Sequence, residues 1–179
     1  MGWYNTGNKT NSAQFLPTVN WAIFNKVAKM ENIKNVASYI INYFQERGDL
    51  ITNLKLQKLL YYVQGWYLAF NNEPAFDEEF QAWIHGPVNN EVYQLYKSFK
   101  WNPITSEQPT VTLNQDLKDL VDKVLDVYGN DSAIELELRT HREAPWIIAR
   151  GELPEDATCS NIITKKSMCD YFHGLRQQA

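Results

Sequence analysis

The chain has 179 residues, of which 44% are apolar and 13% aromatic, and a formal net charge of −4. This composition excludes an intrinsically disordered acidic chain, argues against a basic nucleic-acid binder, and suits one folded domain. Its two cysteines are too few for a disulfide framework or a cysteine-rich zinc site, and no apolar run reaches the roughly 18 residues of a membrane-spanning helix, so we expect a cytoplasmic protein without metal, cofactor or membrane contact.

Residues 1–29 differ in composition from the rest of the chain. They contain no Asp or Glu and begin with a polar stretch rich in Gly, Asn and Thr. They also lack the apolar segment of about 7–15 residues that marks a secretory signal. We interpret residues 1–29 as an N-terminal extension that contributes at most one helix, and residues 30–179 as the domain.

Two helices are predicted next. Apolar residues recur at helical spacing from Ile33 to Phe44, and Gly48 is placed to end this helix. Thr52 can cap a second helix over about residues 53–70. Because this second helix is apolar around most of its circumference, we expect it to lie centrally in a helical bundle. Its aromatic residues expected in the core are Tyr62, Trp66 and Tyr67.

A short strand is predicted after the second helix. Phe80, Ala82 and Ile84 alternate with more polar neighbours, and Gly86-Pro87 is expected to end the strand. A third helix follows over about residues 89–99, with its apolar side expected to face inward. The inward residues of that helix are Val92, Leu95, Tyr96 and Phe99.

The C-terminal half is predicted to be helical. A fourth helix carries an apolar stripe from Leu117 to Tyr128, with Gly129 as its C′ residue. Ser132 and Glu135 have capping-box spacing and open a short helix that holds Ile134 and Leu138. Pro145 suits the first position of a helix over residues 145–150, and Thr164 caps a last helix. The predicted fold is mainly α (α+β): a single-domain helical bundle around a central apolar helix, with a small antiparallel β element near residues 75–86.

Two short motifs combine backbone-fixing residues with a large ring. One runs from Trp83 to Val88 through Gly86-Pro87, and the other runs from Thr140 to Trp146 through Pro145. Both are compatible with packing corners in which the tryptophans are buried. Both are also compatible with interface anchors, because each places polar groups beside a tryptophan.

Signatures of catalysis are absent. The chain has no Gly-x-Gly-x-x-Gly, phosphate-binding loop, His-Glu-x-x-His or Gly-x-Ser-x-Gly motif. A hydrolase that uses His141 with Glu143 is an alternative, but such closely spaced residues at a helix end do not face each other well. We therefore do not expect an enzyme.

The order of several motifs resembles a known family. The motifs are the segment 54–69, Phe76-Asp77-Glu78, Ala82-Trp83, Gly86-Pro87-Val88, Val92-Tyr93, Tyr96-Lys97, Ser132-Ala133-x-Glu135-Leu136 and Thr140-His141-Arg142-Glu143-x-Pro145-Trp146. In this order they resemble the Panacea antitoxin domain, a phage-associated family also called SocA-like antitoxins. The resemblance covers about residues 33–173, so residues 1–29 fall outside it.

This resemblance implies an antitoxin that neutralises a cognate toxin, encoded nearby, by direct protein–protein binding. One family member instead delivers its toxin to an AAA+ protease, which makes a proteolytic adaptor the main alternative. Homo-oligomers, the identity of the toxin and the stoichiometry stay open. The family supplies no catalytic residues, so our candidates have toxin-binding or structural roles. They are Trp83, His85, Gly86, Pro87, Val88, Tyr93, Thr140, His141, Glu143, Pro145 and Trp146.

Overall fold

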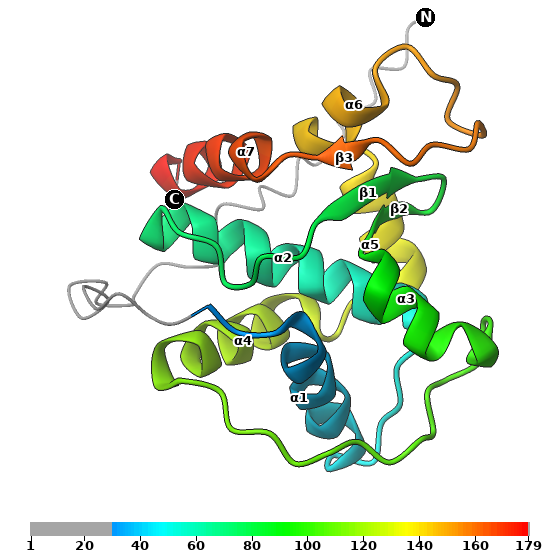
Figure 1. Cartoon of the computed structure of the whole chain (residues 1–179), viewed down its shortest axis with the longest axis vertical. Helices are drawn as coiled ribbons and strands as arrows, with labels where there is room; N and C mark the ends of the chain where they lie inside the picture. Colours follow the sequence, from blue (N-terminus) through cyan, green and yellow to red (C-terminus); the bar gives the residue numbers. More distant parts are fainter. Residues whose placement is uncertain (1–29, 179) are drawn as a thin grey trace, which may run out of the picture.

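A mainly helical arrangement surrounds one long helix (Figure 1). The computed structural model describes residues 30–178, and these contain seven α-helices, one short 3₁₀ helix and a three-stranded antiparallel sheet. The predicted α+β class with a small β element is confirmed. The extension expected over residues 1–29 lies outside the described residues.

The first two helices each begin after a side-chain cap, and the cap of the second helix is the predicted one. α1 spans Ile33–Gln45, and the Asn32 side chain accepts a hydrogen bond from the backbone of its first turn. α2 spans Asn53–Asn71, and the Thr52 hydroxyl accepts from the Lys55 amide. α2 ends at Asn72, which adopts the left-handed conformation.

The predicted central position of α2 is confirmed. It contacts α1, α3, α4, α5, α7 and strand β2, and it is buried at Asn53 and at every residue from Leu56 through Ala69. Even the polar residues Gln57, Lys58 and Gln64 are buried, so each needs a partner inside the protein. Gln57, for example, accepts from the Asn89 amide at 2.8 Å, and Gln64 donates to the Phe76 carbonyl at 2.7 Å.

The sheet is larger than the sequence suggests. β1 (Phe80–Trp83) pairs with β2 (Gly86–Val88) across a turn at Ile84-His85, and with β3 (Ile162–Ile163) on its other side. Gly86-Pro87 therefore begins a second strand and does not simply end the first. Pro87 is tolerated because β2 is an edge strand, where a missing amide donor costs little.

The third predicted helix is shorter and less buried than expected. α3 spans Asn90–Tyr96 and continues as the 3₁₀ helix η3, Lys97–Phe99. Val92 and Tyr96, four residues apart, face the core. Leu95 does not, because only this narrow stripe of a seven-residue helix meets its neighbours; the Leu95 side chain is 50% exposed.

Four helices complete the fold: α4 (Gln115–Tyr128), α5 (Ala133–Thr140), α6 (Ala144–Arg150) and α7 (Lys165–Gln177). The capping box of Ser132 with Glu135 and the Thr164 cap of α7 are confirmed. Gly129 is the C-cap of α4 with an ordinary φ of −65°, so it is not a left-handed C′ residue.

The short helices add one detail to the expectation and correct another. α5 holds Ile134 and Leu138 as predicted, but both are exposed and the inward residue is Leu136, because a two-turn helix packs along one line only. On α6 the first helical residue is Ala144, and Pro145 is the second. Pro145 is still compatible with the helix, since the amides of the first turn have no partner within it.

Candidate functional site

The two motifs singled out in the sequence meet in space. The Trp146 indole on α6 donates to the Trp83 carbonyl at 3.0 Å. The buried Arg150 guanidinium, also on α6, donates to the Ala82 carbonyl at 3.0 Å. These bonds fix α6 against β1, so the two motifs form one structural unit although about sixty residues separate them along the chain.

Gly86 is required at the centre of this unit. Its φ is +90°, and an added β-carbon would lie 2.7 Å from Thr140 Oγ1 and 2.8 Å from Lys58 Cε. The fully buried Lys58 donates from Nζ to the Pro87 carbonyl at 3.0 Å. Burial lowers the pKa of Lys58 to about 7. Gly86, Pro87 and Thr140 are therefore explained by close packing around this lysine.

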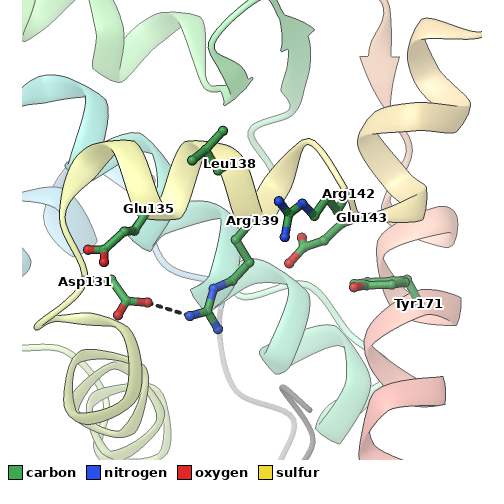
Figure 2. A pocket seen from close by; sticks show the side chains of 7 residues that line it. All are labelled: Asp131, Glu135, Leu138, Arg139, Arg142, Glu143 and Tyr171. Atoms are coloured by element: carbon green, nitrogen blue, oxygen red, sulfur yellow. Dashed lines mark hydrogen bonds and ion pairs between the residues drawn. The ribbon is translucent and has the colours of Figure 1, made fainter. Parts of the chain in front are cut away.

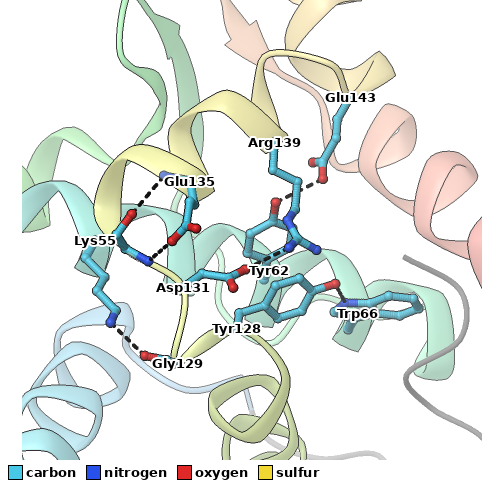
Figure 3. Close-up of polar contacts among 10 residues, drawn as sticks. Lys55, Tyr62, Trp66, Tyr128, Gly129, Asp131, Glu135, Arg139 and Glu143 are labelled. Carbon is cyan, nitrogen blue, oxygen red and sulfur yellow. Dashed lines mark hydrogen bonds and ion pairs between the residues drawn. The ribbon is translucent and has the colours of Figure 1, made fainter. Parts of the chain in front are cut away.

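Glu143 is the second buried ionisable group. It is only 5% exposed, and its carboxylate accepts a hydrogen bond from the Tyr62 hydroxyl at 3.0 Å (Figure 3). The Tyr62 ring stacks on Tyr128 at a centroid distance of 4.0 Å, and Trp66 donates to the Tyr128 hydroxyl at 3.1 Å. Burial raises the pKa of Glu143 to about 7.

His141 lies beside this group without joining it. Its ring stacks on Trp146, with the centroids 4.2 Å apart and the planes 14° from parallel. Burial lowers the pKa of His141, and within residues 30–178 no hydrogen bond links it to Glu143. His141 and Glu143 therefore do not form the preformed acid–base pair that the hydrolase alternative requires.

An aromatic groove opens on the other side of β1 and β2. We use this name for the cavity of about 280 Å³ whose aromatic and basic lining residues are Trp83, His85, Tyr93, Lys97, Lys100 and Trp101. Trp83 and Tyr93 meet edge to face at 4.9 Å, and His85 meets Trp101 in the same way at 5.3 Å. The Trp101 side chain is 66% exposed. Within the described part of the chain, neither groove lysine is paired with a carboxylate.

The structure separates the eleven candidates into two groups. Trp83 and Tyr93 are half-buried and His85 is exposed, and all three lie in the aromatic groove. Val88 is buried and lines the same groove. The others hold the packing unit behind it: Gly86, Pro87, Thr140, His141, Glu143, Pro145 and Trp146.

Trp101, Lys97 and Lys100 complete the groove but were missed by sequence reasoning. Lys97 begins η3, and Lys100 and Trp101 follow that helix at the start of an irregular connection. Only the fold brings them to the same groove as His85. The sequence signal that could have found them is a tryptophan directly after Lys100, outside any apolar stripe. An indole in such a position has no helix face to bury it.

The described residues offer no metal centre and no membrane span. No three His, Cys, Asp or Glu side chains gather closely enough between residues 30 and 178 to hold a metal ion. Within the same range, no helix has both the length and the apolar character that crossing a bilayer requires.

Comparison with known proteins assigns the family. Residues 56–147 match the family model described as "Antitoxin SocA-like, Panacea domain". The chain therefore belongs to this family of antitoxins, a class of proteins defined by a toxin partner. The matched residues include every aromatic and lysine residue of the groove and most of the packing unit behind it.

A curated relative carries the same name. The chain is 31% identical over 115 residues to the Antitoxin SocA of Caulobacter vibrioides (strain NA1000 / CB15N), and this match covers 56% of the chain and 61% of the relative. The chain thus matches less than two thirds of that protein's length. No solved structure matches the chain.

Proposed function

We propose that this chain is an antitoxin that neutralises a cognate toxin by binding it directly in the cytoplasm, and that the aromatic groove is the binding surface. The observation that carries the proposal is a preformed groove that exposes Trp101 beside the half-buried Trp83 and Tyr93, all three of which lie inside the family match. Tryptophan and tyrosine at the centre of a concave surface are the residues that most often dominate the energy of protein interfaces.

The groove also indicates the chemistry of its partner. Its walls are aromatic, while Lys97 and Lys100 place two positive charges at its edge. A segment of the toxin with one apolar side chain flanked by Asp or Glu would fill the cavity and complement these charges. The overall charge of −4 is no obstacle, because local charge determines the complementarity of an interface.

The first experiment asks whether a toxin exists. The open reading frame next to the gene would be expressed alone and together with this protein. Growth arrest by the neighbour alone, relieved by co-expression, is the expected result. A neighbour that is harmless alone would contradict the proposal. A toxin whose half-life falls sharply on co-expression would instead support the adaptor alternative, in which toxin is delivered to an AAA+ protease.

The second experiment asks whether the groove binds the toxin. Trp101→Ala removes an exposed ring and should leave the fold intact, but weaken toxin binding by about thirtyfold, as expected for an interface anchor. Ile148→Ala on α6 is the matched control, because Ile148 is equally exposed, at 67%, and lies outside the groove. Titration calorimetry on the complex measures both affinities. Equal affinities for the two variants would exclude the groove as the binding surface.

A further inference from the structure

A second cavity lies between α5 and α7, away from the aromatic groove. It has a volume of about 360 Å³ and is bordered by Asp131, Glu135, Arg139, Glu143 and Tyr171 among others (Figure 2). We call it the Glu143 pocket. Its volume is far larger than one water molecule needs, so it can admit a side chain or a small ligand.

Glu143 is incompletely satisfied in this pocket. One carboxylate oxygen accepts from Tyr62, but the other, Oε2, is buried and has no hydrogen-bond partner within residues 30–178. The Tyr61 hydroxyl is also buried and makes no hydrogen bond of good geometry in that range, although it lies close enough to the Glu143 carboxyl for the two groups to affect each other's pKa. Figure 2 shows the carboxyl group pointing into the space between Arg139 and Tyr171. A buried carboxylate oxygen without a donor is costly, so a ligand that supplies one gains correspondingly.

The nearby arginines do not supply this donor. Arg139 donates to Asp131 at 2.7 Å, and its guanidinium lies over the Tyr128 ring at 5.3 Å. Arg142 borders the pocket but is exposed, and within the described chain it makes no hydrogen bond to Glu143. The pocket therefore presents three carboxyl groups, of which one is paired with Arg139 and one caps α5.

We infer that the Glu143 pocket binds the guanidinium group of an arginine side chain of the toxin, which donates to the unpartnered oxygen of Glu143. A guanidinium is planar and offers several N–H donors, so it can bond a carboxylate and a neighbouring hydroxyl at once. The inference rests on the proposed function for the source of the arginine, but the chemistry of the pocket can be tested without the toxin.

The pocket also predicts a pH dependence of this binding. The tyrosines around Glu143 are Tyr61 and Tyr62 on α2, Tyr128 on α4 and Tyr171 on α7. The charged groups that line the same pocket are Arg139, Arg142, Asp131 and Glu135. Of these, the tyrosines have pKa values raised above 10, so Glu143 is the group that changes charge near neutrality. Since its pKa is about 7 and only the carboxylate pairs with a cation, affinity should rise about tenfold between pH ~6 and ~8.

The first test uses n-butylguanidinium as the probe and n-butylurea, its neutral analogue of the same shape, as the control. Calorimetric titration of the whole protein should detect millimolar binding of the guanidinium, the rise with pH, and no binding of the urea. Glu143→Gln keeps an acceptor for Tyr62 and should abolish the binding. Glu152→Gln, in the exposed loop after α6 and outside the lining of the pocket, should retain it. Equal binding of both probes, no binding of either, or unchanged binding by Glu143→Gln would overturn the inference.

The second test uses the toxin complex. Glu143→Gln should weaken toxin binding at least tenfold and make the remaining affinity independent of pH between ~6 and ~8. Unchanged toxin affinity of Glu143→Gln, with the same dependence on pH as the wild type, would overturn the inference while leaving the proposed function intact. If the wild-type protein neutralised no product of a neighbouring gene, the proposed function would be overturned. The toxin would then no longer be the source of the arginine, even if n-butylguanidinium binds.

Discussion

Glu143 and Lys58 are ionisable side chains that the fold buries in separate places. Glu143 lies against Tyr62 on the α7 side of α2, and Lys58 lies against the Pro87 carbonyl on the side of the sheet. Burial moves the pKa of each toward about 7, upward for the acid and downward for the base. Both groups therefore reduce stability in their charged form, so packing and hydrogen bonds elsewhere must offset them.

Glu143→Gln should stabilise the protein in a pH-dependent way. The pKa of Glu143 is about 7 in the folded state and 4.5 for a free side chain, so the folded state holds the proton more tightly between these values. Stability is therefore lost as pH rises from 4.5 to about 7, by up to about 3 kcal/mol for this group. In urea unfolding at pH ~8, the free energy of unfolding of Glu143→Gln should exceed that of the wild type by most of this amount. At pH ~4.5 the two proteins should be almost equally stable.

The control for that measurement is Glu152→Gln, because Glu152 is exposed in the loop after α6. It should change the unfolding free energy little at either pH. Suppose that the free energies of unfolding of Glu143→Gln and the wild type differ by the same amount at both pH values. That result would contradict the assigned burial of the Glu143 carboxyl. The variant's stability at neutral pH would also show that any loss of ligand binding is not a loss of fold.

At the scale of elements, the crossing of α2 and α7 depends on a glycine. A β-carbon at Gly65 would lie 2.2 Å from the Phe172 ring. Phe172 is fully buried, with its ring centroid 5.7 Å from that of Tyr61 and 5.2 Å from that of Trp66. The rings around it leave no space for the phenylalanine to move without shifting the helix.

Gly65→Ala should therefore destabilise the protein by about 1–3 kcal/mol, although alanine is the better helix former. Gly174→Ala on α7 is the matched control, since among the described residues no atom outside its own stretch of helix lies within 4 Å of its added β-carbon. That change should stabilise the protein by about 0.5–1 kcal/mol through helix propensity alone. Urea unfolding gives the free energy of unfolding of both variants. If both substitutions stabilised the protein, α7 would not pack closely against Gly65.

Elements that depend on local signals could be predicted from the sequence, whereas those that depend on distant pairing could not. α2 has its cap at Thr52 and an apolar circumference within its own residues, so both its start and its central place follow from the sequence. β3 is a two-residue strand that pairs Ile162 with Gln81, and nothing near it in the chain marks it as a strand. The same applies to the site: Glu143 was a candidate, but its burial against Tyr62 requires residues 81 positions apart to meet.

At the scale of the whole molecule, the folding unit is larger than the segment that defines the family. The match covers residues 56–147, yet α1, β3 and α7 lie outside it. α7 packs along α2 and contributes Met168 and Phe172 to the core. We therefore propose that residues 30–179 form the domain, with the C-terminal helix as an essential part of it.

Removal of residues 164–179 should prevent stable folding. Truncating one buried phenylalanine alone costs about 3–5 kcal/mol, and loss of α7 removes Phe172 together with Met168 and exposes Tyr61 and Trp66 on α2. This sum is comparable to the whole stability of a typical domain, about 5–15 kcal/mol. The shortened chain should show no cooperative urea transition and should bind a dye for exposed apolar surface, whereas a chain of residues 30–179 should unfold cooperatively with the stability of the full-length protein. A cooperative transition in the chain that lacks α7 would mean that the matched segment and α1 suffice for the core.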